Sequence, residues 1–380
     1  MISRACFAAI VLSLLGACSS SSAPPQGGTE TPPKKDASTP SPDGAAPVDD
    51  ASDGAAGPEA ATVDGAVASG AKATAVVVGA RHACALTAAG TVFCWGDNSD
   101  GQLGDGTTDQ RNAPVAVTGL ANPVVAIAAG DQHTCALDST GAVMCWGSNG
   151  SDALGDGSSA AMRSKPGPVP GLTGVTSIGA GGSSTCALTA SGAACWGANG
   201  FGQLGDGTSM NRSMPVATMG LVGGAFAGAY SLAPSADHTC IIASNGSVEC
   251  AGDDTNGALG NGGNVSVPSF VSSGVTNSAT AVASGIAVSC ALTSDGSVQC
   301  WGFGGDGELG NGDIGTSEMP VPVSNLTAVT SIAVGFHHAC AVAAGAVSCW
   351  GDLAVASLDA GLDDGGAASE STPVPITGIP

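Results

Sequence analysis

Basic residues are scarce in this chain of 380 residues. Lysine and arginine together number 9 against 31 aspartates and glutamates, which gives a formal net charge of -22. Nucleic-acid binding depends on Lys and Arg side chains that neutralise phosphates, so we expect no nucleic-acid partner. Charged residues of both signs make up 11% of the chain, whereas glycine supplies 60 residues. So much glycine, with so few Glu, Lys and Arg residues, argues against a helical bundle.

Long apolar runs are also few. The run at the amino terminus follows Arg4 and covers residues 5–15, which suits a signal peptide but is too short for a membrane span of ~20 residues. It leads into the sequence LGAC at residues 15–18. This resembles the bacterial lipoprotein signal, in which the Cys is lipidated and becomes the first residue of the mature chain. We predict a signal peptide over residues 1–17 and lipidation of Cys18; an ordinary signal peptide with an accidental Cys is the alternative.

Residues 18–70 are predicted to form the lipidated Cys and a disordered linker. The segment after the Cys contains eight Pro, eight Ser, eleven Ala, seven Gly and no aromatic residue. It cannot bury enough apolar surface to offset the entropy lost on folding. Such a Pro-stiffened tether would hold a folded domain away from a lipid surface.

Residues 71–380 contain six copies of one repeat. The first copy reads HACALTAAGTVFCWGDNSDGQLGDGT from residue 82. Each copy contains four strand-like pieces, namely an H-x-C-A-L strand, a V-x-C-W strand, a Pro-Val strand and an apolar strand, separated by Gly-rich turns. Four short strands every ~50 residues indicate the blade of a β-propeller. The first cysteines of the six copies are Cys84, Cys135, Cys186, Cys240, Cys290 and Cys340.

These repeats resemble the regulator of chromosome condensation repeat family. The matching features are the H-x-x-A-L strand, the G-x-V-x-x-W-G strand, the G-Q-L-G loop and the Pro-Val strand. The resemblance implies an all-β propeller that serves protein–protein interaction. The family usually has seven blades, whereas six copies occur here. We expect a closed ring of six four-stranded blades over residues 71–380, with a seven-bladed or an incomplete ring as the alternatives.

The two ends of the repeat region are out of phase with each other. The region starts at an apolar strand, residues 75–78, and ends after a Pro-Val strand, residues 373–376. If each copy is counted from its H-x-C strand, the sixth copy lacks its apolar strand. The apolar strand at residues 75–78, at the start of the region, could supply it. This out-of-phase start and end allows the last blade to be completed by strands from both ends.

Twelve of the 14 cysteines lie in the repeats, two per copy, nine or ten residues apart across a turn of two or three residues. In both cases the two cysteines face each other on antiparallel strands, where Cβ atoms lie about 4.5–5.5 Å apart, near the range that a disulfide needs. We predict six disulfides, which would indicate an oxidising compartment; buried free thiols are the alternative. The predicted pairs are Cys84 with Cys94, Cys135 with Cys145, Cys186 with Cys195, Cys240 with Cys250, Cys290 with Cys300, and Cys340 with Cys349.

The sequence contains no catalytic signature such as G-x-S-x-G, H-E-x-x-H or G-x-x-x-x-G-K, and we expect no enzyme, no cofactor and no metal. Asp97, Asp100 and Asp105 resemble calcium ligands, but the EF-hand spacing is missing and Asp-Gly is a common turn dipeptide, so calcium stays an alternative. The five Trp residues of the C-W-G motif predict a core layer of the ring. Histidines that recur two residues before the first Cys of a copy indicate a structural role: His82, His133, His238 and His338.

The charge is unevenly distributed along the chain. The last basic residue is Arg212; residues 213–380 hold 14 acids and no base, whereas residues 71–212 hold nine acids and six bases. Solubility would explain this, as would a surface for a cationic partner or divalent ions. We interpret the chain as a lipid-anchored module that binds a protein or glycan outside the cytoplasm, at the outer membrane or cell surface of a bacterial envelope. A structural envelope component and an envelope enzyme acting on a polymer are the alternatives.

Overall fold

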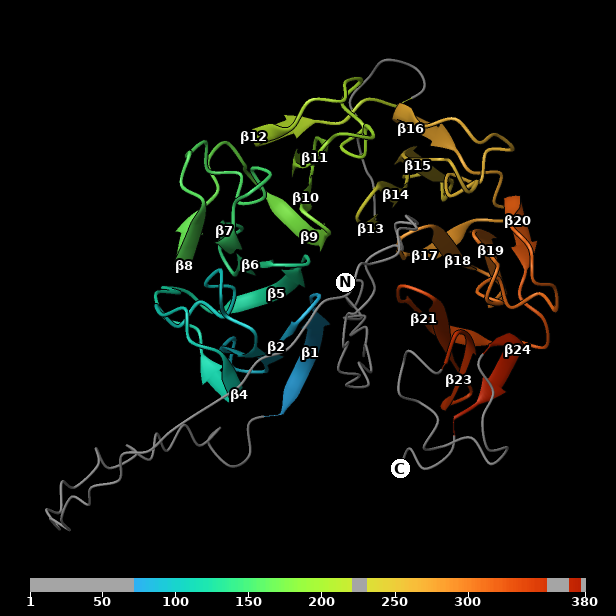
Figure 1. Ribbon diagram of the computed structural model, residues 1–380, viewed down its shortest axis with the longest axis horizontal. Coiled ribbons are helices and arrows are strands. Elements are labelled where there is room, and N and C mark those ends of the chain that lie inside the picture. Colours follow the sequence, from blue (N-terminus) through green and yellow to red (C-terminus); the bar gives the residue numbers. More distant parts are fainter. Residues whose placement is uncertain (1–71, 221–230, 354–368, 377–380) are drawn as a thin grey trace, which may run out of the picture. The chain divides into compact units, whose positions relative to one another are not determined.

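The chain forms six antiparallel sheets of four strands each, which confirm the expected six-bladed β-propeller (Figure 1). The computed structural model describes residues 72–220, 231–353 and 369–376. The predicted signal peptide, Cys18 and the linker lie outside the described residues. Within the described parts, no helix is long and apolar enough to cross a membrane. Figure 1 shows the first strand of each sheet nearest the centre of the ring and the fourth at its rim.

Each sheet is a meander of four consecutive strands. The first sheet contains β1 (Ala73–Val78), β2 (His82–Thr87), β3 (Val92–Gly96) and β4 (Arg111–Ala116). The second contains β5 (Val124–Ala129), β6 (His133–Asp138), β7 (Val143–Ser148) and β8 (Met162–Pro168). The third contains β9 (Val175–Gly181), β10 (Ser184–Thr189), β11 (Gly192–Gly197) and β12 (Arg212–Ala217).

The remaining three sheets follow the same plan. The fourth contains β13 (Ser231–Pro234), β14 (His238–Ile242), β15 (Val248–Gly252) and β16 (Val267–Ser272). The fifth contains β17 (Ala279–Ser284), β18 (Val288–Thr293), β19 (Val298–Gly302) and β20 (Ser317–Pro322). The sixth contains β21 (Val329–Val334), β22 (His338–Ala343), β23 (Ala346–Gly351) and β24 (Glu370–Pro375).

No described blade combines strands from the two ends of the chain, so that expectation is wrong. The apolar strand that we counted last in each copy is the first strand of the next blade. Residues 124–129 of β5, for example, pair with β6 and not with the strands before them. Because the short turn joins the apolar strand to the H-x-C strand that follows it, a chain running from β1 to β24 contains six complete blades.

Six disulfides join the second and third strands of the six sheets, and they are the pairs that the strand register predicts. They link Cys84 with Cys94, Cys135 with Cys145, Cys186 with Cys195, Cys240 with Cys250, Cys290 with Cys300, and Cys340 with Cys349. The cysteines of each pair are direct neighbours across the sheet, with Cα atoms 4.0–4.1 Å apart.

The alternative of buried free thiols is therefore wrong for these twelve cysteines. In the third and sixth sheets the turn is one residue shorter, yet Cys186 still faces Cys195 and Cys340 still faces Cys349. Closing a loop of about ten residues stabilises a fold by roughly 2–3 kcal/mol.

The hydrophobic core lies between the blades. One cluster combines Leu86, Val92 and Leu103 of the first repeat with Ile127 and Trp146 of the second, and similar clusters recur further along the ring. A four-stranded sheet cannot bury both of its faces by itself, so each blade depends on its neighbour for a core.

Tryptophan fixes the distance between neighbouring blades. The Trp146 indole is fully buried, and its Nε1 donates a hydrogen bond to the carbonyl of Gln102 in the preceding repeat at 2.9 Å. Its ring lies against Gly104, where a Cβ atom would come within 2.7 Å of Nε1. Three further indoles, those of Trp196, Trp301 and Trp350, make the same bond to the preceding loop at 2.8–2.9 Å. The tryptophans therefore form a core layer, as predicted, and they form it between sheets.

The fourth repeat fills this position in another way. Ala251 replaces the tryptophan, and the fully buried Phe270 of β16 packs with Ala251 and Ile241. A Cβ atom on Gly205 of the preceding loop would meet the Phe270 ring at 2.3 Å. A phenyl group from the outer strand thus takes the place of an indole from the third strand.

Three of the repeated histidines join adjacent blades. His82 Nε2 lies 2.9 Å from Thr134 Oγ1 of the next blade, and Thr134 in turn donates to the Gln102 carbonyl. Because the Thr134 hydroxyl proton is already used, His82 must donate from Nε2. Burial lowers the pKa of His82 to about 4 and that of His133 to about 3. A structural role for these histidines is what the sequence indicates, and equivalent links join His133 to Thr185 and His238 to Ser289.

Strand contacts connect five pairs of neighbouring sheets, from the first sheet through to the sixth. In each pair, the first strand of one sheet touches the first and second strands of the sheet before it. Within the described residues, the sixth and first sheets share no comparable strand contact, and Trp95 of the first sheet is only half-buried. Closure of the ring therefore stays a prediction.

The contact between Trp146 and Gly104 predicts a large difference between two glycine substitutions. Gly104 and Gly119 both have positive φ, +70° and +91°, but a Cβ on Gly119 would meet nothing within 4 Å. Alanine costs about 1–2 kcal/mol at either position through backbone strain, and overpacking adds roughly 1–3 kcal/mol at Gly104 alone. Urea unfolding of the oxidised protein should show Gly104→Ala as the more destabilising variant; equal midpoints would contradict the role given to Trp146.

Candidate binding face

Two sets of loops meet at one end of the propeller. One set follows the third strand of each sheet, and the other consists of the turns that join the first and second strands. They touch across blade boundaries: Gln203, in the loop after β11, donates from Nε2 to the carbonyl of Ala236, in the turn before β14, at 3.1 Å. We call this end the loop face. Because its residues come from several blades, side chains distant in sequence are brought together there.

In the first five sheets, the loop after the third strand contains a buried leucine at its base. Leu103 is fully buried, and its backbone N–H donates to Asn98 Oδ1 at 3.0 Å. The same bond is made by Leu154 to Asn149, by Leu204 to Asn199 and by Leu259 to Asp254. In the fourth repeat a carboxylate thus occupies a position that holds an amide in the first three.

Arginines in the first three sheets neutralise acids of their own loops. The pairs are Arg111 with Asp105 at 2.9 Å, Arg212 with Asp206 at 2.6 Å, and Arg163 with Asp156. Sheets four to six place other residues at this strand position: Val267, Ser317 and Glu370. Loss of the arginine from these positions contributes to the uneven charge seen in the sequence, because three of the six bases in residues 71–212 occupy this site.

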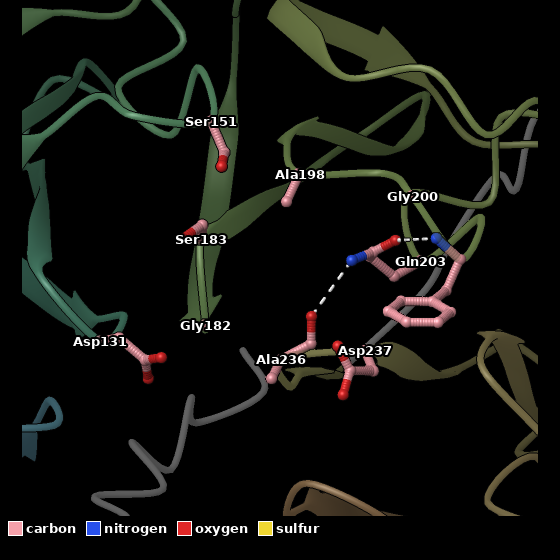
Figure 2. Close-up of a pocket in the computed structure, with 10 residues that line it drawn as sticks. Asp131, Ser151, Gly182, Ser183, Ala198, Gly200, Gln203, Ala236 and Asp237 are labelled. Atoms are coloured by element: carbon pink, nitrogen blue, oxygen red, sulfur yellow. Dashed lines mark hydrogen bonds between the residues drawn. The ribbon is translucent and has the colours of Figure 1, made fainter. Parts of the chain in front are cut away.

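A pocket of about 280 Å³ opens on the loop face between sheets two, three and four (Figure 2). Gln203 forms part of the pocket wall. Its Oε1 accepts a hydrogen bond from the Phe201 N–H at 3.0 Å, and its Nε2 donates to the carbonyl of Ala236. Phe201 lines the pocket and is 48% exposed. None of the lining residues is Lys or Arg. The other side chains of the wall include those of Asp131, Ser151, Ser183 and Asp237.

Two carboxylates give the pocket an acidic character. Burial raises the pKa of Asp131. Burial, and then the neighbouring charges of Asp253 and Asp131, raise the pKa of Asp237. Carboxylates that disfavour one another's ionisation produce a negative potential that attracts a cation. With Phe201 in the same wall, the pocket suits a Lys or Arg side chain, whose cation is also attracted to an aromatic face.

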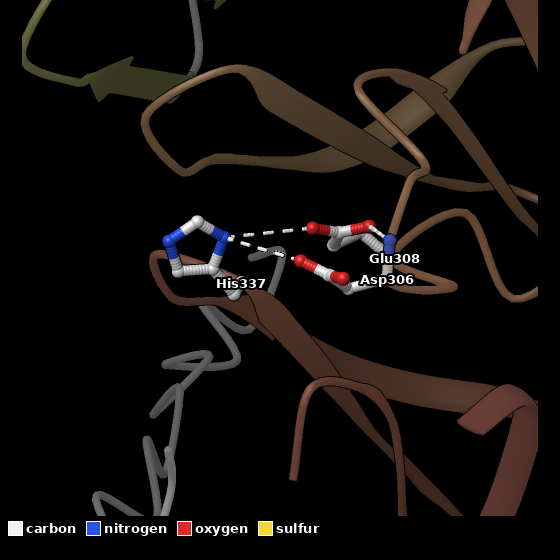
Figure 3. Close-up of side chains that lie close together, drawn as sticks. All are labelled: Asp306, Glu308 and His337. Carbon is white, nitrogen blue, oxygen red and sulfur yellow. Dashed lines mark hydrogen bonds and ion pairs between the residues drawn. The ribbon is translucent and has the colours of Figure 1, made fainter. Parts of the chain in front are cut away.

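A second group of titratable side chains lies on the loop face between sheets five and six (Figure 3). Asp306 and Glu308 belong to the loop after β19, and His337 belongs to the turn before β22. His337 Nδ1 lies 3.6 Å from Glu308 Oε1 and 3.9 Å from Asp306 Oδ2. Burial raises the pKa of Glu308. This group has no signature in the sequence, because its members come from two blades.

The aspartates of the first loop have other contacts. Asp105 is paired with Arg111, and Asp97 accepts hydrogen bonds from Ser99 N–H at 3.2 Å and Gln102 Nε2 at 3.1 Å. Among the described residues, Asp97, Asp100 and Asp105 do not form a group of three potential metal ligands. These contacts stabilise the loop itself.

Comparisons with known proteins identify the repeat. The family described as the RCC1-like domain matches residues 43–341. Protein RCC2 of Homo sapiens is 42% identical over 79 residues, which are 20% of this chain and 15% of that protein. The mitochondrial RCC1 domain-containing protein RUG3 of Arabidopsis thaliana is 35% identical over 130 residues, 32% of this chain and 29% of that protein. The chain thus spans less than a third of the length of these relatives.

Solved structures share the fold over most of the chain. Human WBSCR16 superposes with a TM-score of 0.69 at 20% identity, covering 81% of this chain and 82% of that one. Yeast RCC1 (Prp20), in a structure with Kap60 bound, also gives a TM-score of 0.69, at 21% identity, covering 80% of this chain and 74% of that one. At these identities the likeness shows the fold alone.

The buried carboxyl of Asp254 predicts a pH-dependent gain in stability for Asp254→Asn. Burial raises the pKa of Asp254 to about 6, against opposing hydrogen bonds from Leu259 and Asn261. A folded pKa above the unfolded value of 3.8 means that ionisation destabilises the fold, progressively as pH rises from about 4 through 6. The variant should gain roughly 1–2 kcal/mol at about pH 7.5, a screened fraction of the full penalty, and nothing at about pH 3.5.

Thermal unfolding at the two pH values measures this difference. Asp313→Asn is the control, because Asp313 is exposed and its loss should leave stability nearly unchanged at both. A gain from Asp254→Asn that is as large at the lower pH as at the higher one would contradict an origin in ionisation.

Proposed function

The chain belongs to the RCC1-like domain family, and from this premise we propose that it is a protein-binding module without catalytic activity, held by a lipid on Cys18 at the extracytoplasmic side of a bacterial cell envelope. The RCC1-like propeller is a protein-interaction fold, and yeast RCC1 is one neighbour that was solved with a protein, Kap60, bound. We do not propose Kap60 as a partner of this chain. We propose only that this chain, too, uses a rigid propeller to present loops to a protein.

The proposed location is supported by two features. The LGAC sequence at residues 15–18 follows an apolar run of signal-peptide length. Six disulfides also hold the six blades, and disulfides of this kind persist in oxidising compartments outside the cytoplasm.

The acidic pocket on the loop face carries the proposal for the partner. Asp131 and Asp237 face a space of about 280 Å³ that also contains Phe201 and no basic side chain. We propose that a Lys or Arg side chain of a protein partner enters it, with the negative field of the loop face steering the encounter. Ser151 and Ser183 line the same pocket, but no histidine does, so the wall holds no serine–histidine pair of the kind that activates a nucleophilic hydroxyl.

A capture experiment tests the partner. The oxidised protein would be immobilised, exposed to an envelope extract, and eluted with a salt step. A stoichiometric basic protein should elute, and its binding should weaken by roughly tenfold in Asp131→Asn/Asp237→Asn, as expected when about 1.4 kcal/mol of charge interaction is lost. The control Asp313→Asn changes an exposed carboxylate outside the pocket and should bind like the unaltered protein. Equal binding by all three proteins would place the partner elsewhere.

A labelling experiment tests the anchor. Cys18→Ser removes the thiol that would accept the lipid, so the variant should incorporate no radiolabelled palmitate in a bacterial host and should leave the membrane fraction. Cys6→Ser changes the other cysteine outside the repeats and should keep both the label and the membrane association. Labelling of the Cys18 variant at the unaltered level would refute the lipid anchor.

A further inference from the structure

The three side chains between sheets five and six have the composition of a metal site. His337 supplies an imidazole nitrogen, and Asp306 and Glu308 supply one carboxylate oxygen each; the three atoms lie within 4.8 Å of one another. In Figure 3 both carboxylates point towards the imidazole from one loop, across the boundary between two blades.

The buried carboxylate of Glu308 favours a cation at this site. Its side chain is only 1% exposed. Its Oε2 accepts the Asp306 N–H at 2.8 Å, whereas Oε1 has no hydrogen-bond donor and lies on the side of His337. A buried carboxylate oxygen without a partner is costly, and buried charges in proteins are paired or bind metals.

The other repeats show what Glu308 has replaced. Gln102 and Gln203 stand at the equivalent loop position, and their Oε1 atoms accept the same backbone bond, at 2.9 Å and 3.0 Å. Their Nε2 atoms are satisfied by donating to Asp97 and Ala236. Glu308 keeps the backbone bond but presents an acceptor where glutamine presents a donor.

The facing turn changes at the same blade boundary. The position of His337, directly before the second strand, is held in the five preceding repeats by Arg81, Gln132, Ser183, Asp237 and Ala287. Glu308 and His337 thus occur together at one of the described blade boundaries, the one between sheets five and six. Their joint occurrence favours a shared ligand over two unrelated substitutions.

We propose that Asp306, Glu308 and His337 bind one divalent first-row transition-metal ion, of which Zn²⁺ is the representative. The imidazole nitrogen favours such an ion over Ca²⁺ or Mg²⁺, which prefer oxygen ligands alone. Two ligands of a tetrahedral zinc ion lie about 3.3 Å apart. The His337 nitrogen lies 3.6 Å and 3.9 Å from the carboxylate oxygens, and all three donor atoms lie within 4.8 Å of one another, so small side-chain movements would bring them to one ion. Three protein ligands leave a coordination position open on the loop face, where His337 and Asp306 are 46% and 44% exposed.

Calorimetric titration of the untagged, oxidised full chain with Zn²⁺, after removal of metal with a chelator, tests the site. One equivalent should bind and raise the unfolding temperature, because the ion joins two blades of the folded state. Glu308→Gln and His337→Ala should each weaken binding by at least about tenfold, since even the loss of an outer-shell partner has an effect of that size. Glu308→Gln is expected to fold, as glutamine stands at this position in two other repeats.

Asp237→Asn is the matched control. It removes a carboxylate at the turn position equivalent to that of His337, two blades earlier, and should leave the one-equivalent titration unchanged. The proposal is overturned if no zinc binds, if Glu308→Gln and His337→Ala bind as tightly as the unaltered protein, or if Asp237→Asn weakens binding as much as they do. That last outcome would assign the binding to the acidic face in general. The result is independent of partner capture, which reports on the pocket between sheets two and four.

Discussion

The propeller depends on the contact between one blade's large aromatic side chain and the loop of the blade before it. Neither surface is complete alone: the indole of Trp146 needs the Gln102 carbonyl for its N–H, and the loop needs a glycine at residue 104 so that its backbone can approach the ring. The histidine links, such as that between His82 and Thr134, add a second polar contact at the same boundary. Because these contacts also hold the loop bases in place, they give the loop face its geometry.

The sequence predicts what is decided within one repeat. Opposition of Cys186 and Cys195 depends only on the length of one turn, and the strand types depend on residues a few positions apart. The phase of the blade was predicted wrongly because a cyclic repeat reads the same from any starting strand, and only the pairing of β5 with β6 identifies the first one. The Asp306, Glu308 and His337 group could not be predicted, because it depends on which loop touches which turn in the ring.

The loop face divides into two chemically different regions. In the first three repeats, arginines such as Arg111 neutralise loop acids internally, whereas Asp131 of the second sheet and Asp237 of the fourth line a pocket whose wall includes no Lys or Arg. In the later repeats the arginine position is lost, and the acids of the fifth loop meet a histidine instead. A repeated scaffold thus keeps its backbone geometry while single positions change the chemistry of its loops.

The disulfides have a consequence for how the chain matures. The nearest cysteine in sequence to each repeat cysteine is its native partner, nine or ten residues away, as Cys94 is to Cys84, while the next pair begins some forty residues later. In a chain that emerges from its amino terminus, every pair is therefore exposed together, before the following pair arrives. Oxidation in order of emergence would give the native connectivity directly, with no wrong pair to correct.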